Sequence, residues 1–518
     1  MDPLRSGTRA AMAAFLAPLV ACASGGGGMG SQNGADASGG GDVDGVSLSS
    51  SGFSGSVGSN QSGGSSGSGG SSGSGGSSGS GGSSGSGGSS GSGGSSGSSG
   101  SAAPDGGSGS GGDGGPGVDS GSTSGATSGS GKGDAGAAGP DAAAAPPDTL
   151  APTPPMGWNS WESFRCNLNA ALIQGVADAI VSSGMQAAGY QYVNLDDCWM
   201  DGRDANGNLR WNTTKFPSGI PALASYVHGK GLKFGIYESA NTVTCVGLYG
   251  GIAPSVAAGS LGHEAQDAAT FASWGVDFLK YDLCAGDRNS FVKMRDGLRA
   301  TGRPVVYSIN PGNATGYPPN TPGWDPVSIA NMWRVAYDIN TSYASVTSII
   351  DQDAPFFAYA GPGHWNDADG LEVGKGLSID EDRSQFSMWA ILVSPLLAGN
   401  DIRSMTETTH DILTNAEVIA VDQDPLGKQG QLVATPQTNV QIWSKELSGQ
   451  NTRAVVVLNR TAAAATVTVP WTTVGLPAGN AIVRNLWTHT DLGAFAHGFT
   501  ATAIPSHGAV MLRVTSVP

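Results

Sequence analysis

From Pro155 onward the sequence repeats one pattern eight times: a short apolar run that ends in polar or charged residues, followed by a segment of mixed character. Apolar runs of this length are typical of strands buried on both faces, as in a parallel sheet covered by helices. The eight runs are Met156–Trp161, Tyr190–Asp197, Leu232–Ser239, Val276–Leu283, Pro304–Asn310, Asn331–Asp338, Phe356–Asp367 and Trp389–Asn400. Segments such as Ala170–Ala188, Ile220–Gly229 and Ala265–Trp274 have the length and spacing expected of the covering helices.

Eight strand–helix units predict an α/β fold, a (β/α)8 TIM barrel, over residues 149–428. The alternative is a doubly wound open sheet, which binds its ligand at a single crevice. Charged and aromatic residues follow nearly every run, so the barrel is favoured. After about Gly430 the helical signals disappear, and short runs separated by Gly, Pro and Asn predict a small C-terminal antiparallel β-sandwich over residues 429–518. These runs are Val440–Ser444, Ala454–Asn459, Ala465–Val469, Ile482–Leu486 and Ala509–Val514.

Glycine and serine dominate the first part of the chain, and most of the 84 glycines lie before position 140. A GGSSGS-like repeat runs through this tract. Because the tract has no apolar side chains to bury, it cannot offset the entropy cost of ordering. We therefore expect residues 23–148 to be a disordered linker that tethers the folded part.

The first 22 residues read as a lipoprotein signal peptide. Arg5 and Arg9 precede an apolar stretch that is too short to span a bilayer as a helix. The stretch ends in Leu-Val-Ala-Cys22, which resembles the bacterial lipobox, in which the cysteine is acylated. We expect export and lipid anchoring through Cys22 at the bacterial cell envelope, at the outer membrane or cell surface. The alternative is a plain signal peptide and secretion.

Charge and cysteine content narrow the class of protein further. The formal net charge is −16, whereas nucleic-acid binding requires a basic surface, so nucleic acid is excluded as a partner. Membrane contact is expected only through the lipid anchor. Four cysteines remain after Cys22, and their spacing fits no zinc pattern, so we expect disulfides in an oxidising compartment.

Functional-looking side chains gather at the ends of the predicted strands, where barrel enzymes build their sites. They are Asp196, Asp197, Glu238, Lys280, Asp282, Arg334, Asp338, Asp367 and Asp369, with Trp161, Trp199, Tyr237 and Trp365 among them. Carboxylates flanked by aromatic rings suit a sugar, because rings stack on its C–H faces and carboxylates bind its hydroxyls.

A metal or a cofactor is the competing explanation for the acidic residues. Residues 204–208 resemble a calcium loop, but Leu209 stands where an EF-hand requires glycine, so we interpret the segment as a turn. No pair of histidines has metal-ligand spacing, and no GxSxG or P-loop motif occurs. No metal and no cofactor are expected.

Eight ordered motifs resemble glycoside hydrolase family 27 from about Pro154 to the C-terminus: PPMGWNSW, LDDCW, GIYES, FLKYDLC, WRVAYDI, GPGHWND, SPLLAGNDI and DQDPLGKQG. The best-known members are α-galactosidases and α-N-acetylgalactosaminidases. The resemblance implies a retaining exo-glycosidase that acts on terminal α-D-galactosyl residues of oligosaccharides or glycoconjugates. It makes Asp282 the nucleophile and Asp338 the general acid/base.

The same resemblance implies the remaining site residues. Asp196 and Asp197 would bind the O4 and O6 hydroxyls of the sugar, and Lys280 would bind O3 and O4. Trp161 would pack against the ring, Tyr237 would line the pocket, and Arg334 would reach O2. The two disulfides would be Cys166–Cys198 and Cys245–Cys284.

Local sequence supports the two catalytic roles. A retaining glycosidase needs one ionised and one protonated carboxyl, about 5–5.5 Å apart. Lys280, two residues before Asp282 on the same strand face, favours an ionised nucleophile. Asp338 follows a largely apolar stretch, which favours its protonated form.

One segment departs from the family pattern. The α-galactosidases commonly place Glu-Trp-Pro after the fifth strand, on the O2 side of the sugar, whereas residues 308–312 read Ser-Ile-Asn-Pro-Gly. Asn310 can still contact O2, but α-N-acetylgalactosaminidase and β-L-arabinopyranosidase activities stay open. The aspartate pair in LDDCW favours a hexose with a 6-hydroxyl. A catalytically silent galactoside-binding surface protein is a further alternative, although it would not need both Asp282 and Asp338.

Overall fold

A computed structural model describes residues 150–285, 288–311 and 325–517. The predicted signal peptide (1–22), the lipidation site Cys22 and the predicted linker (23–148) lie outside these residues. The described residues belong to one compact unit. Within them, no helix has the length and apolar character needed to cross a membrane.

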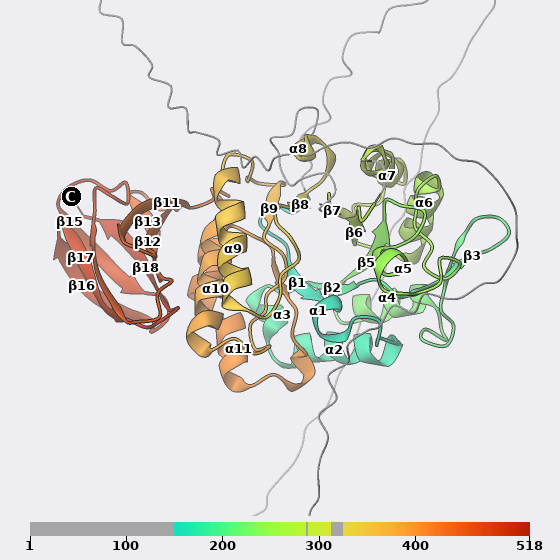
Figure 1. Cartoon of the computed structure of the whole chain (residues 1–518), viewed down its shortest axis with the longest axis horizontal. Helices are drawn as coiled ribbons and strands as arrows, with labels where there is room; N and C mark the ends of the chain where they lie inside the picture. Colours follow the sequence, from blue (N-terminus) through green and yellow to red (C-terminus); the bar gives the residue numbers. More distant parts are fainter. Residues whose placement is uncertain (1–149, 286–287, 312–324, 518) are drawn as a thin grey trace, which may run out of the picture. The chain divides into compact units, whose positions relative to one another are not determined.

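The larger part of the described chain is a closed parallel barrel (Figure 1), as the sequence predicts. Its eight strands are hydrogen-bonded in the order β10-β1-β2-β5-β6-β7-β8-β9, and a parallel bridge between Leu371 and Ala398 connects the segment after β9 to β10. The strands are β1 (Met156–Asn159), β2 (Tyr192–Leu195), β5 (Lys233–Ser239), β6 (Phe278–Asp282), β7 (Val306–Asn310), β8 (Met332–Arg334), β9 (Trp365–Asp367) and β10 (Leu396–Ala398).

Helices surround the barrel and bury their apolar faces against it (Figure 1). They are α1 (Trp161–Phe164), α2 (Ala170–Ser182), α3 (Met185–Ala188), α4 (Ile220–Gly229), α5 (Cys245–Tyr249), α6 (Glu264–Trp274), α7 (Asn289–Ala300), α8 (Pro326–Ile329), α9 (Tyr343–Asp353), α10 (Ile379–Leu392), α11 (Glu407–Leu413) and α12 (Ala416–Asp422). Side-chain caps define several starts; Ser378 and Glu381 form a reciprocal capping box at α10.

Two predicted strands begin later than expected. In Phe356–Asp367 the first residue ends a 3-10 turn (Ala354–Phe356), and β9 starts only at Trp365 because two glycines and a proline intervene. In Trp389–Asn400 the first residues complete α10, which is buried almost all round and so has no polar face to reveal its helical period.

The hairpin of β3 (Met200–Arg203) and β4 (Leu209–Trp211) follows the second barrel strand. Its connection is the segment that resembles a calcium loop. The Asp204 carboxylate accepts hydrogen bonds from the backbone N–H groups of Asn206 and Asn208 at 2.8 and 2.9 Å. The segment is therefore a turn held by its own aspartate, as expected.

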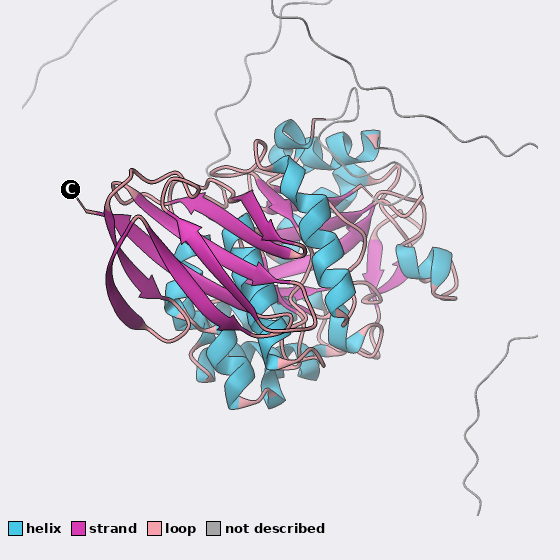
Figure 2. Cartoon of the chain, turned by 60° about the vertical axis from the view of Figure 1, so that its left-hand side comes forward, coloured by secondary structure: helices cyan, strands magenta, loops and turns pink. Residues whose placement is uncertain are grey.

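The C-terminal part consists of antiparallel strands, as predicted (Figure 2). A six-stranded sheet, β11-β12-β13-β18-β15-β16, packs on a two-stranded sheet, β14-β17. The strands are β11 (Gln431–Gln437), β12 (Val440–Glu446), β13 (Thr452–Asn459), β14 (Ala465–Pro470), β15 (Asn480–Asn485), β16 (Thr490–Ala496), β17 (Gly498–Ile504) and β18 (Ala509–Ser516).

The second face of the six-stranded sheet packs on the barrel helices. In β13, Val455 and Val457 face the smaller sheet, whereas Ala454 and Val456 join the barrel core, as the two-residue period of a strand requires. This contact also buries two charged side chains, Asp422 of α12 and Lys445 of β12.

Asp422 and Lys445 are 0% and 1% exposed. Burial raises the pKa of Asp422, and burial lowers the pKa of Lys445 to about 8. Neither the Lys445 ammonium nor Oδ1 of Asp422 has a hydrogen-bond partner among the described residues. Burying both groups without full pairing costs free energy of folding.

Candidate active site

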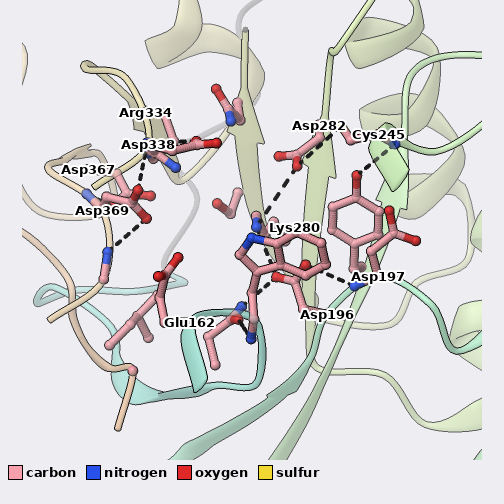
Figure 3. A pocket seen from close by; sticks show the side chains of 18 of the residues that line it. Glu162, Asp196, Asp197, Cys245, Lys280, Asp282, Arg334, Asp338, Asp367 and Asp369 are labelled. Atoms are coloured by element: carbon pink, nitrogen blue, oxygen red, sulfur yellow. Dashed lines mark hydrogen bonds and ion pairs between the residues drawn. The ribbon is translucent and has the colours of Figure 1, made fainter. Parts of the chain in front are cut away.

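A cavity of about 520 Å³ opens at the carboxyl ends of the barrel strands (Figure 3). All nine side chains that the sequence nominates for catalysis or sugar binding line it. They are Trp161, Asp196, Asp197, Tyr237, Lys280, Asp282, Asn310, Arg334 and Asp338. Every barrel strand, or the residues directly after it, contributes to the lining.

The two-residue period of the strands decides which side chains face the cavity. On β6, Phe278 lies in an apolar layer with the first residues of neighbouring strands and contributes to the cavity floor. Lys280 and Asp282 follow on the same face. Lys280 lies one layer above Phe278, and Asp282 lies one layer above Lys280. The register pairs Asp282 with Asn310 of β7, so these two side chains lie side by side at the upper rim.

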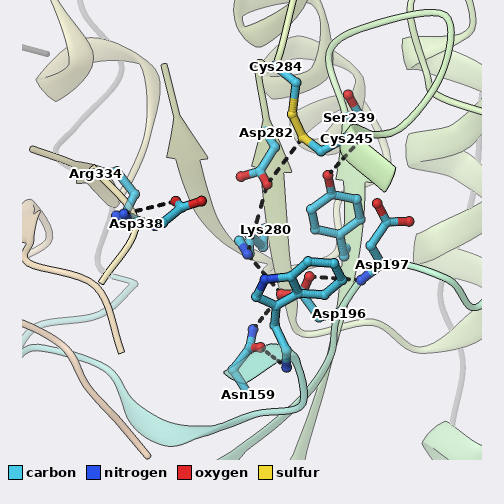
Figure 4. A network of polar contacts seen from close by, with 12 residues as sticks. Asn159, Asp196, Asp197, Ser239, Cys245, Lys280, Asp282, Cys284, Arg334 and Asp338 are labelled. Carbon is cyan, nitrogen blue, oxygen red and sulfur yellow. Dashed lines mark hydrogen bonds and ion pairs between the residues drawn. A yellow bond between two sulfur atoms is a disulfide. The ribbon is translucent and has the colours of Figure 1, made fainter. Parts of the chain in front are cut away.

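Asp282 is buried and lies close to positive charge. Its Oδ2 atom is 3.9 Å from Nζ of Lys280, and its Oδ1 atom is buried without a hydrogen bond to any described residue. Burial raises the pKa of Asp282 to about 7; Lys280 opposes this shift, and the carboxylates of Asp196 and Asp338 add to it. The side chains of Asp282 and Asp338 enter the same space from different strands (Figure 4).

A fixed polar group forms the floor beside Asp282. Nζ of Lys280 donates to Oδ2 of Asp196 at 2.8 Å, and Nδ2 of Asn159 donates to the same oxygen at 2.8 Å. Burial lowers the pKa of Lys280, but Asp196 and Asp282 raise it more, so the ammonium stays charged. The Lys280 ammonium also lies 5.3 Å from the ring centre of Tyr237.

Asp197 is held by backbone groups from two segments. Oδ1 accepts from the Cys198 N–H at 2.6 Å, and Oδ2 accepts from the Val246 N–H of α5 at 3.1 Å. Burial raises its pKa to about 6, although these hydrogen bonds oppose the shift. The side chain therefore has a single orientation at the cavity wall.

Arg334 organises the opposite wall. Its Nη2 atom lies 3.2 Å from Oδ1 of Asp338 and 2.7 Å from Oδ2 of Asp369. Asp369 adopts a left-handed backbone conformation with φ 75° and also accepts the N–H of Ile339 at 2.9 Å. Asp338, the second candidate catalytic residue, is therefore linked to Asp369, which follows β9. The link runs through the ion pairs of Arg334 and through the backbone N–H of Ile339.

The electrostatic expectations for the two carboxyls do not hold in the free protein. Lys280 lowers the pKa of Asp282 as expected, but burial has the larger effect and the net shift is upward. The pKa of Asp338 is lowered, chiefly by Arg334, although an apolar stretch precedes it. Val335 and Ala336 turn into the core, but Tyr337 is exposed and the Asp338 side chain is 77% exposed, so the carboxyl lies at the mouth.

Both predicted disulfides form, Cys166–Cys198 and Cys245–Cys284. The second ties α5 to the segment after β6, and Sγ of Cys245 lies 3.8 Å from Oδ2 of Asp282. Cys245, Cys284 and Asp282 together have the composition of a metal site. Since both sulfurs are joined in a disulfide, neither is a thiolate that could bind a cation.

Three of the strand-end side chains are not part of the cavity lining. Glu238 neighbours Tyr237 on β5 and therefore points outward, towards Asp267 of the helix layer. Trp199 packs against Trp274 of α6 with ring centres 5.6 Å apart. Trp365 belongs to the apolar layer at the start of the strands.

Other lining residues were not nominated as site residues. Asp367 and Asp369 were recognised as strand-end carboxylates without a role, and the period of β9 places Asp367 on the inner face. Glu162 follows Trp161 directly, and burial raises its pKa to about 7. Tyr249 of α5 carries no sequence signal, because tertiary contacts such as the Cys245–Cys284 disulfide and the Val246–Asp197 hydrogen bond bring α5 to the cavity.

Comparison with known proteins agrees with this geometry. Residues 153–424, more than half of the chain, match a family model described as alpha galactosidase A, and residues 437–514 match the alpha galactosidase C-terminal beta sandwich domain. An alpha-galactosidase of Cyamopsis tetragonoloba is 45% identical over 378 residues, which cover 71% of this chain and 87% of that protein.

Solved structures give the same result. Alpha-galactosidase I from Mortierella vinacea superposes with a TM-score of 0.65 at 35% identity, over 71% of this chain and 98% of that one. An alpha-galactosidase from Saccharomyces cerevisiae, solved with raffinose, has a TM-score of 0.65 at 27% identity, over 71% and 99% of the two chains. The similarity thus covers the barrel and the C-terminal strands together.

Proposed function

Because the chain belongs to glycoside hydrolase family 27 and is an α-galactosidase that removes terminal α-galactosyl residues, we propose that it does so by a retaining, two-aspartate mechanism. Asp282 is the nucleophile and Asp338 is the general acid/base. The observation that carries the proposal is the entry of both carboxyls into one cavity from different strands, with Lys280 beside one and Arg334 beside the other.

In the first step the Asp282 carboxylate, which lines the cavity, attacks the anomeric carbon. Asp338 gives its proton to the glycosidic oxygen, and the C–O bond to the leaving group breaks. A galactosyl ester on Asp282 results. In the second step Asp338 takes a proton from water, which attacks the anomeric carbon, breaks its bond to Asp282 and releases galactose with its α configuration retained.

The two carboxyls share one proton in the active form. In the free protein that proton resides on Asp282, whose pKa is about 7, because Arg334 keeps the pKa of Asp338 low. The productive arrangement has the proton on Asp338. A sugar hydroxyl that occupies Arg334 weakens its pairing with Asp338 and therefore favours this transfer.

Galactose recognition is assigned to the floor and the walls. Asp196 and Asp197 bind the O4 and O6 hydroxyls, Lys280 binds O3 and O4, and Trp161 packs against the ring. The support is the rigid placement of these groups: Lys280 and Asp196 are paired at 2.8 Å, and backbone N–H groups hold Asp197. Groups held in position before binding lose little entropy when the sugar arrives.

The O2 side is formed by Asn310 together with Arg334. Of the residues that depart from the family pattern, Gly312 lies outside the described residues, whereas Ser308 and Asn310 line the cavity. The preference for one sugar over another is measured by comparing hydrolysis rates on p-nitrophenyl α-galactoside, α-N-acetylgalactosaminide and β-L-arabinopyranoside. We expect the galactoside to be the best substrate, because the aspartate pair binds a 6-hydroxyl that arabinopyranose lacks.

The mechanism is tested by following the anomeric configuration of the first product by NMR. We expect α-galactose to appear before mutarotation, and its β anomer would exclude retention. Asp282→Asn should lower kcat by several orders of magnitude. Asp411→Asn is the matched control, because Asp411 lies on α11 with a side chain that is 70% exposed. Equal activity in the two variants would place the nucleophile elsewhere.

For localisation, we propose that Cys22 carries the lipid that anchors the enzyme to the bacterial envelope. The support is the sequence Leu-Val-Ala-Cys after a short apolar stretch. Cys22→Ala should abolish incorporation of labelled acyl chains and release the protein from the membrane fraction. Absence of label in the wild-type chain would replace the anchor with a plain signal peptide.

A further inference from the structure

The mouth of the catalytic cavity is marked by two exposed residues. Among the described residues that line the cavity, Tyr249 is 74% exposed and the Asp338 side chain is 77% exposed, whereas the others are buried or half-buried. Because Asp338 protonates the glycosidic oxygen, the leaving group must pass through this part of the cavity. Tyr249 therefore lines the route of the leaving group.

The Tyr249 ring is held in place despite its exposure. Its hydroxyl donates to the backbone carbonyl of Cys284 at 2.7 Å, and the disulfide Cys245–Cys284 fixes the start of the same helix, α5. The Val246 N–H donates to Asp197 at 3.1 Å. An antiparallel bridge between Val243 and Ala258 joins the two ends of the segment that contains α5. A ring that is already ordered loses little conformational entropy when it binds a ligand.

The surroundings of the ring define the kind of ligand. The hydroxyl of Tyr249 is used by Cys284, so the ring offers an apolar surface. The charged groups of Asp338, Arg334 and Glu162 line the same cavity. A lipid chain would displace water from these charged groups without replacing its hydrogen bonds, whereas a second sugar can bind them through its hydroxyls and cover the ring with its C–H face.

We propose that Tyr249 forms the stacking wall of a leaving-group subsite, and that its ring raises kcat/KM for α-galactosides whose leaving group is another sugar. This inference rests on the proposed function, because it takes Asp338 as the proton donor. It adds a specificity-determining residue outside the galactose site.

The test compares two substrates that share the galactosyl group. Raffinose has a sugar leaving group, whereas the leaving group of α-galactosyl fluoride is a single fluoride ion that cannot touch Tyr249. For full-length protein, Tyr249→Ala should lower kcat/KM for raffinose by roughly 3- to 10-fold and should leave kcat/KM for the fluoride within about 2-fold. Tyr249→Phe keeps the ring but loses the hydrogen bond to Cys284, so its kcat/KM for raffinose should lie between those of the wild type and Tyr249→Ala.

Leu248→Ala is the matched control, because Leu248 lies on α5, is 40% exposed and does not line the cavity. It should change neither rate. An equal loss on raffinose and fluoride in Tyr249→Ala would mean that the ring supports the fold of the site, and no loss on raffinose would exclude the subsite. If the wild-type chain hydrolyses neither substrate, the proposed function fails, and that result is distinct from a failure of the Tyr249 inference.

Discussion

Removal of the disulfide Cys245–Cys284 should weaken both stability and catalysis, and a second disulfide in the same barrel provides the reference. Cys245 and Cys284 are 39 residues apart, and Cys166 and Cys198 are 32 apart. Loop-closure entropy predicts that each crosslink stabilises the fold by about 4 kcal/mol, with almost no difference between the two loop lengths. Replacing either pair by serine should therefore lower the free energy of unfolding by a similar amount.

The effects on catalysis should differ, because the two crosslinks lie differently relative to the nucleophile. Cys245 and Cys284 both line the cavity, and Sγ of Cys245 is 3.8 Å from Asp282. The sulfurs of Cys166 and Cys198 do not line it. We expect kcat/KM to fall by at least about tenfold without Cys245–Cys284, because a small displacement of a reacting group is costly, and by much less without Cys166–Cys198.

The assay combines urea unfolding with steady-state rates on p-nitrophenyl α-galactoside, measured where both double variants remain folded. Two results would refute the reasoning. A loss of less than about 1 kcal/mol on removing Cys245–Cys284 would contradict the loop-closure argument. Equal losses of kcat/KM in the two variants would show that this disulfide acts on the site only through general stability.

Three further predictions concern pH, the buried pair and the linker. With raffinose, kcat/KM should fall as pH rises through about 7, because the pair then loses the proton that Asp338 must donate; a profile that stays flat to pH 9 would contradict the pKa of Asp282. The double variant Asp422→Asn/Lys445→Met should leave the free energy of unfolding unchanged or raise it by about 1–4 kcal/mol, and a clear loss in urea unfolding would show that the pair stabilises the fold. Deletion of residues 25–139 should leave Tm and kcat nearly unchanged, since that tract can bury almost nothing, and a fall of several degrees would show that it packs on the barrel.

The strand positions of the barrel could be predicted because each buried strand is a short apolar run bounded by polar residues. The same signal fails where burial is different. In α10 the residues Trp389–Leu392 are apolar without interruption, since the helix is covered by both the barrel and the C-terminal sheet, and they read as a strand. Strands β11, β16 and β17 are not predicted, because many of their residues are exposed and no apolar run identifies them.

The site was predictable in so far as it follows from strand ends and motifs. The nine nominated residues converge because alternate residues of parallel strands face the barrel interior. The sequence does not predict which of Asp282 and Asp338 has the higher pKa, since this depends on how deeply each carboxyl is buried and on the distance to Arg334. Tyr249 was also not predictable, because its place depends on a short helix that a disulfide carries to the cavity.

The central claim is the division of roles between Asp282 and Asp338, and azide rescue tests it most directly. In Asp282→Ala, azide should attack the vacated face and give the β-galactosyl azide, with inverted configuration. In Asp338→Ala, a substrate with a good leaving group still forms the intermediate on Asp282, and azide should give the α-galactosyl azide, with retained configuration. The opposite pairing of variants with products would mean that the roles are exchanged, and full hydrolytic activity in either variant would place the chemistry outside this pair.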